Sequence, residues 1–118
     1  MVLVDTSVWI AHLRQGTIGL KALLHGGRVV CHPFIVGELA CGNLRNRSEI
    51  LSLLQKLPGA IRAEHEEVMQ FIENYGLMGK GLGYIDTHLL ASARLTGAAL
   101  WTLDKRLNEV AIQLKVAP

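Results

Sequence analysis

The chain has 118 residues, half of them hydrophobic, and a formal net charge of +2 at pH 7. This length and composition predict one globular domain with a single core, and no apolar run reaches the roughly 18 residues of a membrane-spanning helix. Its two cysteines, Cys31 and Cys41, are too few for a disulfide framework, so we expect reduced core thiols. The first residues form a strand without a preceding basic segment, so we expect no signal peptide and a cytoplasmic location.

Short apolar segments alternate along the chain with longer amphipathic segments. In chain order, the short segments predict strands at 2–5, 28–32, 60–62, 99–103 and 115–117. The longer segments predict helices at 7–14, 17–26, 33–42, 49–57, 64–75, 84–95 and 105–114. We expect Thr17 to cap the second helix and Pro33 to lie in the first turn of the third. Strands separated by helices favour βαβ units, a mostly parallel sheet and the α/β class.

Aspartate occurs only three times, and each aspartate lies inside or beside apolar sequence. Asp5 ends the first predicted strand, Asp104 follows the fourth, and Asp86 lies in the first turn of a helix. Ligands of open parallel sheets bind beyond the carboxyl ends of the strands, so Asp5 and Asp104 lie side by side if their strands are neighbours. Glu38 stands among apolar residues of its helix, where a carboxylate is costly unless a charged group meets it.

Two interpretations of these acids are open. Asp5, Asp86 and Asp104 can each be an N-cap or first-turn acid that stabilises its helix by about 1 kcal/mol, although capping does not account for Glu38. Alternatively, the four carboxylates form one cluster, which requires a cation to neutralise it. Oxygen ligands select Mg²⁺ or Mn²⁺, and no HExxH or CxxC spacing supports zinc. The hydroxyls placed to hydrogen-bond the acids, or to serve as caps, belong to Thr6, Ser7 and Thr102.

The remaining charge favours a polyanionic substrate. Without the four acids of the predicted cluster, six acidic residues remain against twelve lysines and arginines. An acidic pocket within a basic surround is suited to a phosphate bound through a metal. The glycine-rich segment 75–84 matches no nucleotide-binding motif, and we interpret it as a mobile flap leading to Asp86. The candidate phosphate contacts are Arg45, Arg47, Lys80, Lys105 and Arg106.

Four segments in this order resemble the acidic motifs of PIN-domain ribonucleases, in particular the VapC-type toxins of bacterial toxin–antitoxin pairs. They are "VDTSVWI", "PFIVGELACG", "GLGYIDTHLLASA" and "LWTLDKRL". The resemblance runs from residue 2 to about 107 and implies a single PIN domain over 1–118. It implies a three-layer α/β/α fold with a five-stranded parallel sheet of order 3-2-1-4-5.

The resemblance also implies an activity and partners. The activity is endoribonuclease hydrolysis of RNA phosphodiester bonds, dependent on Mg²⁺ or Mn²⁺ held by Asp5, Glu38, Asp86 and Asp104. VapC-like proteins usually dimerise and are inhibited by a cognate antitoxin, so we expect a homodimer, an antitoxin partner and no membrane association.

Two other classes of function stay open on the residues alone. A phosphatase that forms an aspartyl-phosphate usually carries a second acid two residues after the nucleophile, where this chain has Ser7. A catalytically inactive module would use a groove to capture a partner helix, and intact acids at four positions argue against it. The apolar face of the helix at 49–57 can pack in the core or receive an antitoxin segment or a second subunit.

Overall fold

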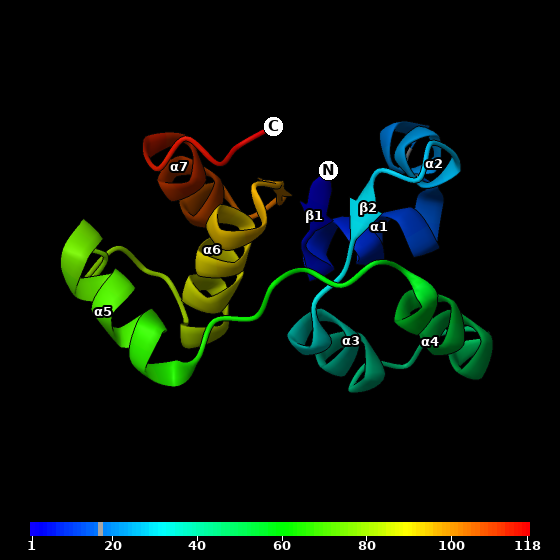
Figure 1. Cartoon of the computed structure of the whole chain (residues 1–118). Helices are drawn as coiled ribbons and strands as arrows, with labels where there is room; N and C mark the ends of the chain where they lie inside the picture. Colours follow the sequence, from blue (N-terminus) through cyan, green and yellow to red (C-terminus); the bar gives the residue numbers. More distant parts are fainter. Residues whose placement is uncertain (17) are drawn as a thin grey trace.

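The computed structural model describes residues 1–16 and 18–118, and the predicted cap Thr17 lies outside the described residues. A parallel sheet forms the centre of the molecule (Figure 1). Its strands are β1 (Val2–Val4), β2 (Val29–Val30) and β3 (Ala99–Trp101), in the order β2-β1-β3. β1 is therefore central, and the carboxyl ends of all three strands meet at one edge of the sheet.

The sheet has three strands within the described residues, where the sequence predicts five. Beyond β2, the predicted strand at 60–62 is replaced by a single parallel bridge between Cys31 and Gly59. Cys31 N–H donates to the Pro58 carbonyl at 2.9 Å, and Ala60 N–H donates to the Cys31 carbonyl at 2.8 Å. Pro58 has no N–H to extend the ladder before this bridge, and Pro33 has none to extend it afterwards, so pairing is limited to the bridge.

Beyond β3, the predicted strand at 115–117 makes one backbone contact with the sheet. Leu100 N–H donates to the Val116 carbonyl at 2.6 Å. Lys115 has a φ of +60°, a turn conformation that brings the chain back directly from the last helix and leaves little length for a ladder. Both outer segments lie against the expected edges, but the five-stranded order is not confirmed.

Helices connect the strands, and each predicted helix is present with ends within two residues of the expected ones. The helices in the described chain are α1 (Thr6–Gln15), α2 (Ile18–His25), α3 (Pro33–Ala40), α4 (Arg47–Lys56), α5 (His65–Tyr75), α6 (Tyr84–Thr96) and α7 (Lys105–Gln113). Local signals set several ends: Pro33 occupies the first turn of α3, and Gly76 and Gly97 end α5 and α6 in the left-handed conformation.

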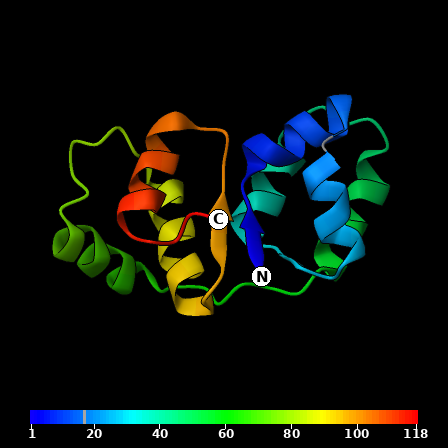
Figure 2. The same ribbon diagram turned by 90° about the horizontal axis from the view of Figure 1, so that it is seen from above.

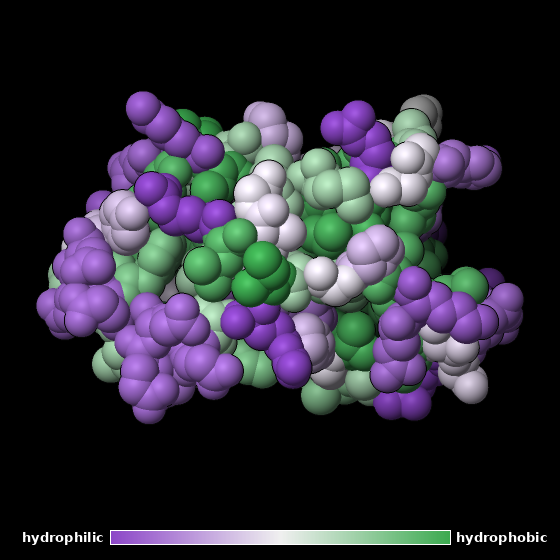
Figure 3. Space-filling view, viewed as in Figure 1, coloured by the Kyte–Doolittle hydropathy of each residue, from purple (hydrophilic) through white to green (hydrophobic). Residues whose placement is uncertain are grey.

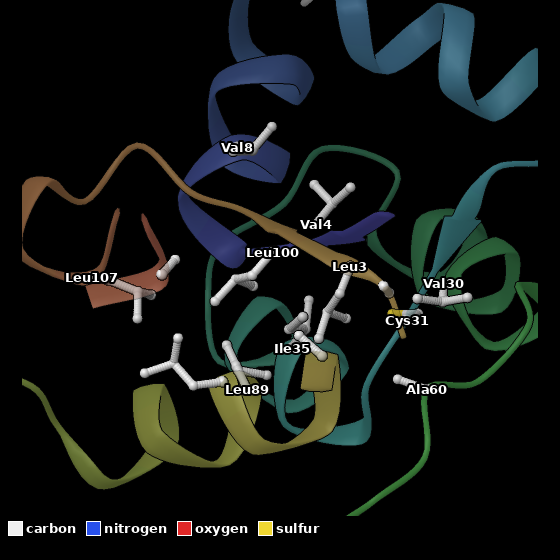
Figure 4. Close-up of a cluster of buried hydrophobic side chains, with 14 of the residues drawn as sticks. Leu3, Val4, Val8, Val30, Cys31, Ile35, Ala60, Leu89, Leu100 and Leu107 are labelled. Atoms are coloured by element: carbon white, nitrogen blue, oxygen red, sulfur yellow. The ribbon is translucent and has the colours of Figure 1, made fainter. Parts of the chain in front are cut away.

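The side chains of β1 alternate between two helical layers, as a strand requires. Figure 4 shows Leu3 pointing toward Ile35 of α3 and Leu89 of α6, while Val4 points toward Val8 of α1. All five side chains are at most 1% exposed. The sheet is therefore covered on both faces, which gives the expected α/β/α layering.

The molecule is elongated, with extents of 40 × 24 × 23 Å. Figures 1 and 2 show α5 at one end, packed beyond α6, and α4 at the other. Hydrophilic residues gather over these two ends, while apolar residues reach the surface along the middle of the face shown in Figure 3. None of the helices in the described part of the chain is long and apolar enough to cross a membrane.

Both cysteines are free thiols. Cys31 is buried, as expected, and burial raises the pKa of its thiol. Cys41 follows the last turn of α3 and is exposed, so the expectation of a core thiol is wrong at that position.

The glycine-rich segment between α5 and α6 packs against α7. Lys80 Nζ donates to Gln113 Oε1 at 3.5 Å. Gly81 has a φ of +77°, and a Cβ at this position would lie 2.7 Å from Cδ and Nη1 of Arg106. These contacts hold the segment against α7, whereas the sequence led us to expect a mobile flap.

We predict that Gly81→Ala lowers the free energy of unfolding by about 1–2 kcal/mol, because an L side chain is strained at this φ. Urea denaturation measures the change. Gly79→Ala is the matched control, since Gly79 has a φ of +72° with no atom near its Cβ position. We expect Gly81→Ala to cost more than Gly79→Ala, by the displacement of Arg106. Equal losses of unfolding free energy in the two variants would show that the close approach of Gly81 to Arg106 does not affect stability.

His32 caps α3 from a buried position. Its ring is 2% exposed, and Nδ1 accepts the Phe34 N–H at 3.0 Å, so the neutral ring carries its proton on Nε2. Nε2 has no hydrogen-bond partner in the described structure. Burial, followed by the nearby charges of His88 and Arg62, lowers the His32 pKa to about 4.

We predict that this histidine makes the protein less stable in mild acid. The unfolded chain takes up a proton near pH 6.5 that folded His32 refuses until about pH 4, so the free energy of unfolding falls as the pH drops through that window. His32→Asn keeps a capping side chain without a titrating group, and its stability should fall less steeply between these pH values. Urea unfolding of both proteins across the window tests this, and parallel curves would contradict it.

Candidate active site

Asp5 lies at the carboxyl end of the central strand and is 7% exposed. Its Oδ2 accepts two hydrogen bonds, from Ser7 Oγ and from Thr102 Oγ1, each 2.7 Å long. Asp5 is also the N-cap residue of α1, but its side chain makes no capping hydrogen bond. The capping interpretation therefore does not account for this carboxylate.

The two hydroxyls that hold Asp5 also fix the turn after β3. Ser7 Oγ accepts the Leu103 N–H at 3.0 Å, and Thr102 Oγ1 accepts the Asp104 N–H at 3.0 Å. Each hydroxyl thus accepts from the backbone and donates to the carboxylate, which gives the network one consistent direction of proton donation. The start of α1 and the start of α7 are joined through Asp5.

Asp104 is the N-cap of α7, and its Oδ1 accepts the Leu107 N–H at 3.1 Å. Asp86, in the first turn of α6, accepts the Gly83 N–H through Oδ2 at 2.9 Å. The capping interpretation is therefore right for one carboxylate oxygen of Asp86 and one of Asp104. An acid can cap a helix and still face a neighbouring charge, because its second oxygen remains available.

The charges of Asp5 and Asp104 act on Asp86. Asp86 is half-buried, and burial is the main cause that raises its pKa. The carboxylates of Asp5 and Asp104 raise this pKa further, while the hydrogen bond from Gly83 lowers it. The end of β1, the start of α6 and the start of α7 therefore bring negative charges into one place.

Glu38 is connected to the other acids through the hydroxyl of Thr6. Thr6 Oγ1 donates to Glu38 Oε1 at 2.7 Å, so Glu38 is tied to the residue that follows Asp5. The expectation that Glu38 is buried at a cost is wrong: it is exposed, because α3 turns Ile35 and Leu39 to the core instead. Its position beside Thr6, and not its burial, relates it to the other acids.

A hard divalent cation fits this group of acids by ligand chemistry and by charge. The donors are carboxylate and hydroxyl oxygens. Burial raises the pKa of Asp86 and the carboxylates of Asp5 and Asp104 raise it further, and a cation would offset both effects. Within the described residues, no three His, Cys, Asp or Glu side chains are already arranged as a set of metal ligands. Asp5 and Asp104 act on the charge of Asp86, and all four acids accept hydrogen bonds from protein donors.

The five basic residues predicted to contact phosphate fall into two groups. Lys105 and Arg106 follow Asp104 on α7, and the chain at Lys80 packs on the same helix. Arg45 and Arg47 lie around the start of α4, where the Arg47 guanidinium donates to the Ala40 carbonyl from Nε at 3.3 Å and from Nη2 at 2.8 Å. Arg47 therefore has a structural role at the end of α3 that the sequence did not indicate.

A second group of side chains, on α3, α6 and the segment before α5, was missed in the sequence. We call it the ring pocket, a cavity lined by His32, Phe34, Arg62, His65, Tyr84 and His88. These residues are far apart in the chain and share no motif. The available signal was one helical spacing: Phe34 lies four residues before Glu38 and so shares its face of the helix.

Comparison with known proteins shows the family of the chain. The PIN domain family matches the chain over residues 2–113, a range that contains all four acids. The chain is 43% identical over 118 residues to the protein named Ribonuclease VapC32 of Mycobacterium tuberculosis strains CDC 1551 / Oshkosh and ATCC 25618 / H37Rv. Each of these alignments covers 99% of this chain and 95% of the relative. The chain therefore belongs to the PIN-domain family and is a VapC-type PIN ribonuclease, the family that its four acidic segments predicted.

Proposed function

We propose that this chain, as a single PIN domain over 1–118, is a metal-dependent endoribonuclease and the toxin of a toxin–antitoxin pair. The observation that carries the proposal is the meeting of Asp5, Asp86 and Asp104, whose charges act on one another at the carboxyl edge of the sheet. The similarity to Ribonuclease VapC32 along almost the whole chain supports RNA as the substrate.

The residues that would hold Mg²⁺ or Mn²⁺ are Asp5, Glu38, Asp86 and Asp104. A bound ion of this kind lowers the pKa of a water molecule and stabilises the charge that develops on a phosphoryl group. The hydroxyls of Ser7 and Thr102 orient Asp5, and that of Thr6 orients Glu38. The Gly83 and Leu107 N–H groups hold one oxygen each of Asp86 and Asp104. The protein thus presents its acids in fixed orientations.

The basic residues Lys80, Lys105 and Arg106 would bind phosphates of the RNA on one side of the acids, and Arg45 and Arg47 on the other. Arg106 packs against Gly81, so the position of its guanidinium depends on the glycine-rich segment. This arrangement favours cleavage of a strand that crosses the acids.

We also propose inhibition by a cognate antitoxin and a homodimeric state, as is usual for VapC-like proteins. The apolar face of α4 is mostly used inside the monomer: Leu54 is buried, and Ile50, Leu51 and Leu57 pack on the core. Leu53 remains 54% exposed and is available for a partner.

The phosphatase alternative gains no support from the geometry. A second acid would be expected at position 7, and the Ser7 hydroxyl there is committed to Asp5 and to the Leu103 N–H. An inactive binding module would share the fold, and only the assay of cleavage separates it from an enzyme.

We predict that Asp5→Asn abolishes RNA cleavage in Mg²⁺ and leaves the fold intact, because asparagine keeps an acceptor oxygen for the two hydroxyls. Mg²⁺ should raise the melting temperature of the wild type by binding only the folded state, and this increase should shrink in the variant. Thermal melts with chelator and with millimolar Mg²⁺, beside an RNase assay, measure both effects.

The control for Asp5→Asn is Glu109→Gln, which removes one negative charge from an exposed position of α7 outside the acids. It should keep both cleavage and the Mg²⁺ increase. An Asp5→Asn protein that cuts RNA normally and keeps the full increase would refute the metal site.

We predict that Lys80→Ala weakens RNA binding and lowers the slope of log affinity against log salt by ~0.7, the value for one phosphate contact of a single strand. Binding is measured with chelator present, so that no RNA is cut. Lys56→Ala, at an exposed position near the end of α4, is the control and should leave the slope unchanged. An unaltered slope in Lys80→Ala would remove this lysine from the binding surface.

A further inference from the structure

The ring pocket is a cavity of about 520 Å³ between the start of α3, the segment before α5 and the first turns of α6. Its rings form a connected series of contacts. The ring centroids of Tyr84 and His88 lie 4.6 Å apart at 86°, those of Phe34 and His88 4.8 Å apart at 72°, and those of His32 and Phe34 5.0 Å apart at 59°. His65 Nδ1 and the Tyr84 hydroxyl share a hydrogen bond.

Three of these rings are accessible from solvent. Phe34 is 36% exposed, Tyr84 is 44% exposed and His65 is also exposed, while His32 and His88 are buried. Aromatic rings that meet edge to face leave ring faces uncovered, and such faces are the surfaces on which nucleobases stack. The wall of the pocket also contains a polar group without a partner, the buried Nε2 of His32.

The charge of the pocket is small, which distinguishes it from a phosphate site. Arg62 and Glu64 carry opposite formal charges at its exposed rim, and they are the only Lys, Arg, Asp or Glu residues among the described lining. A cluster of phosphates would require several cations. One arginine beside aromatic rings suits an uncharged base that is followed by a single phosphate.

The position of the pocket relates it to the acids. Phe34 and Glu38 are four residues apart on α3, a spacing that places both on one face of the helix about 6 Å apart along its axis. On α6, Tyr84 and His88 lie two residues before and after Asp86, a spacing that turns their rings to the other side of the helix from Asp86. The same two helices therefore present rings to the pocket and acids to the candidate active site.

We propose that the ring pocket holds an unstacked base of single-stranded RNA next to the bond that is cut, with Arg62 on the adjoining phosphate. This inference rests on the proposed ribonuclease function and adds a site that recognises a base of the RNA substrate. Stacking on the exposed rings would bind any base, and hydrogen bonds from the wall would favour some bases over others.

Binding of a short single-stranded RNA to the full chain, followed by fluorescence anisotropy with chelator present, tests the proposal. The second probe is the same oligonucleotide with one abasic position. We expect Phe34→Ala to weaken binding of the intact RNA about tenfold or more, and Phe34→Trp to retain it. Tyr75→Ala removes a ring of similar exposure on α5, outside the ring pocket, and should bind as the wild type does.

The comparison of the two probes isolates the base. The wild type should bind the intact RNA more tightly than an abasic RNA with the gap at the bound position, which is found by moving the gap along the strand. Phe34→Ala should lose this difference. The proposal would be overturned if Phe34→Ala bound the RNA like the wild type, or if it still discriminated equally between the two probes. It would also be overturned if the wild type bound every abasic RNA as tightly as the intact one.

The two proposals fail separately. If the wild type cuts RNA in Mg²⁺ and Phe34→Ala has the same kcat and KM, the ring pocket is refuted and the ribonuclease function stands. If the wild type binds RNA with a Phe34-dependent preference for the base and cuts nothing in Mg²⁺ or Mn²⁺, the ribonuclease function is refuted and the base site stands.

Discussion

Two hydroxyl hydrogen bonds to the buried carboxylate of Asp5 join the ends of β1 and β3. The same hydroxyls accept the N–H groups of Leu103 and Asp104, so one polar network sets the turn after β3 and the start of α7. A buried carboxylate is stable only if its hydrogen bonds are satisfied, which couples the position of Asp5 to the packing of the sheet. The candidate active site and the central strand pairing thus depend on the same few atoms.

The protein places like charges together at this point and holds them there with neutral donors. Two of the acids are engaged at helix N-termini, where N–H groups favour a carboxylate: Asp104 with Leu107, and Asp86 with Gly83. Burial raises the pKa of Asp86, and repulsion from Asp5 and Asp104 raises it further. Helix capping and metal binding are therefore compatible roles for one acid, because one carboxylate oxygen can accept a helix N–H while the other is available to a metal ion.

The helices α3 and α6 carry two functions along their length. Each contributes an acid to the candidate active site, Glu38 or Asp86, and rings to the ring pocket. Both helices also pack Ile35 and Leu89 under the central strand. Because the rings and the acids stand on rigid elements of one core, their relative positions are set by the fold and not by a loop. A substrate that contacts both would be aligned by the protein without a large conformational change.

The sequence by itself determined the helices, the α/β class, the family and the position of each acid in the chain, because periodicity, prolines, glycines and motifs act locally. Tertiary structure decided what depends on distant partners. The segment near residue 60 makes one bridge to the sheet and the segment near 116 makes one hydrogen bond to it. Neither forms a strand, since strand pairing needs a matching neighbour. Glu38 is exposed although its sequence neighbours are apolar, because the direction of α3 decides which face is buried. The ring pocket joins residues between 32 and 88, which tertiary contacts such as those of His32 and Phe34 with His88 bring together.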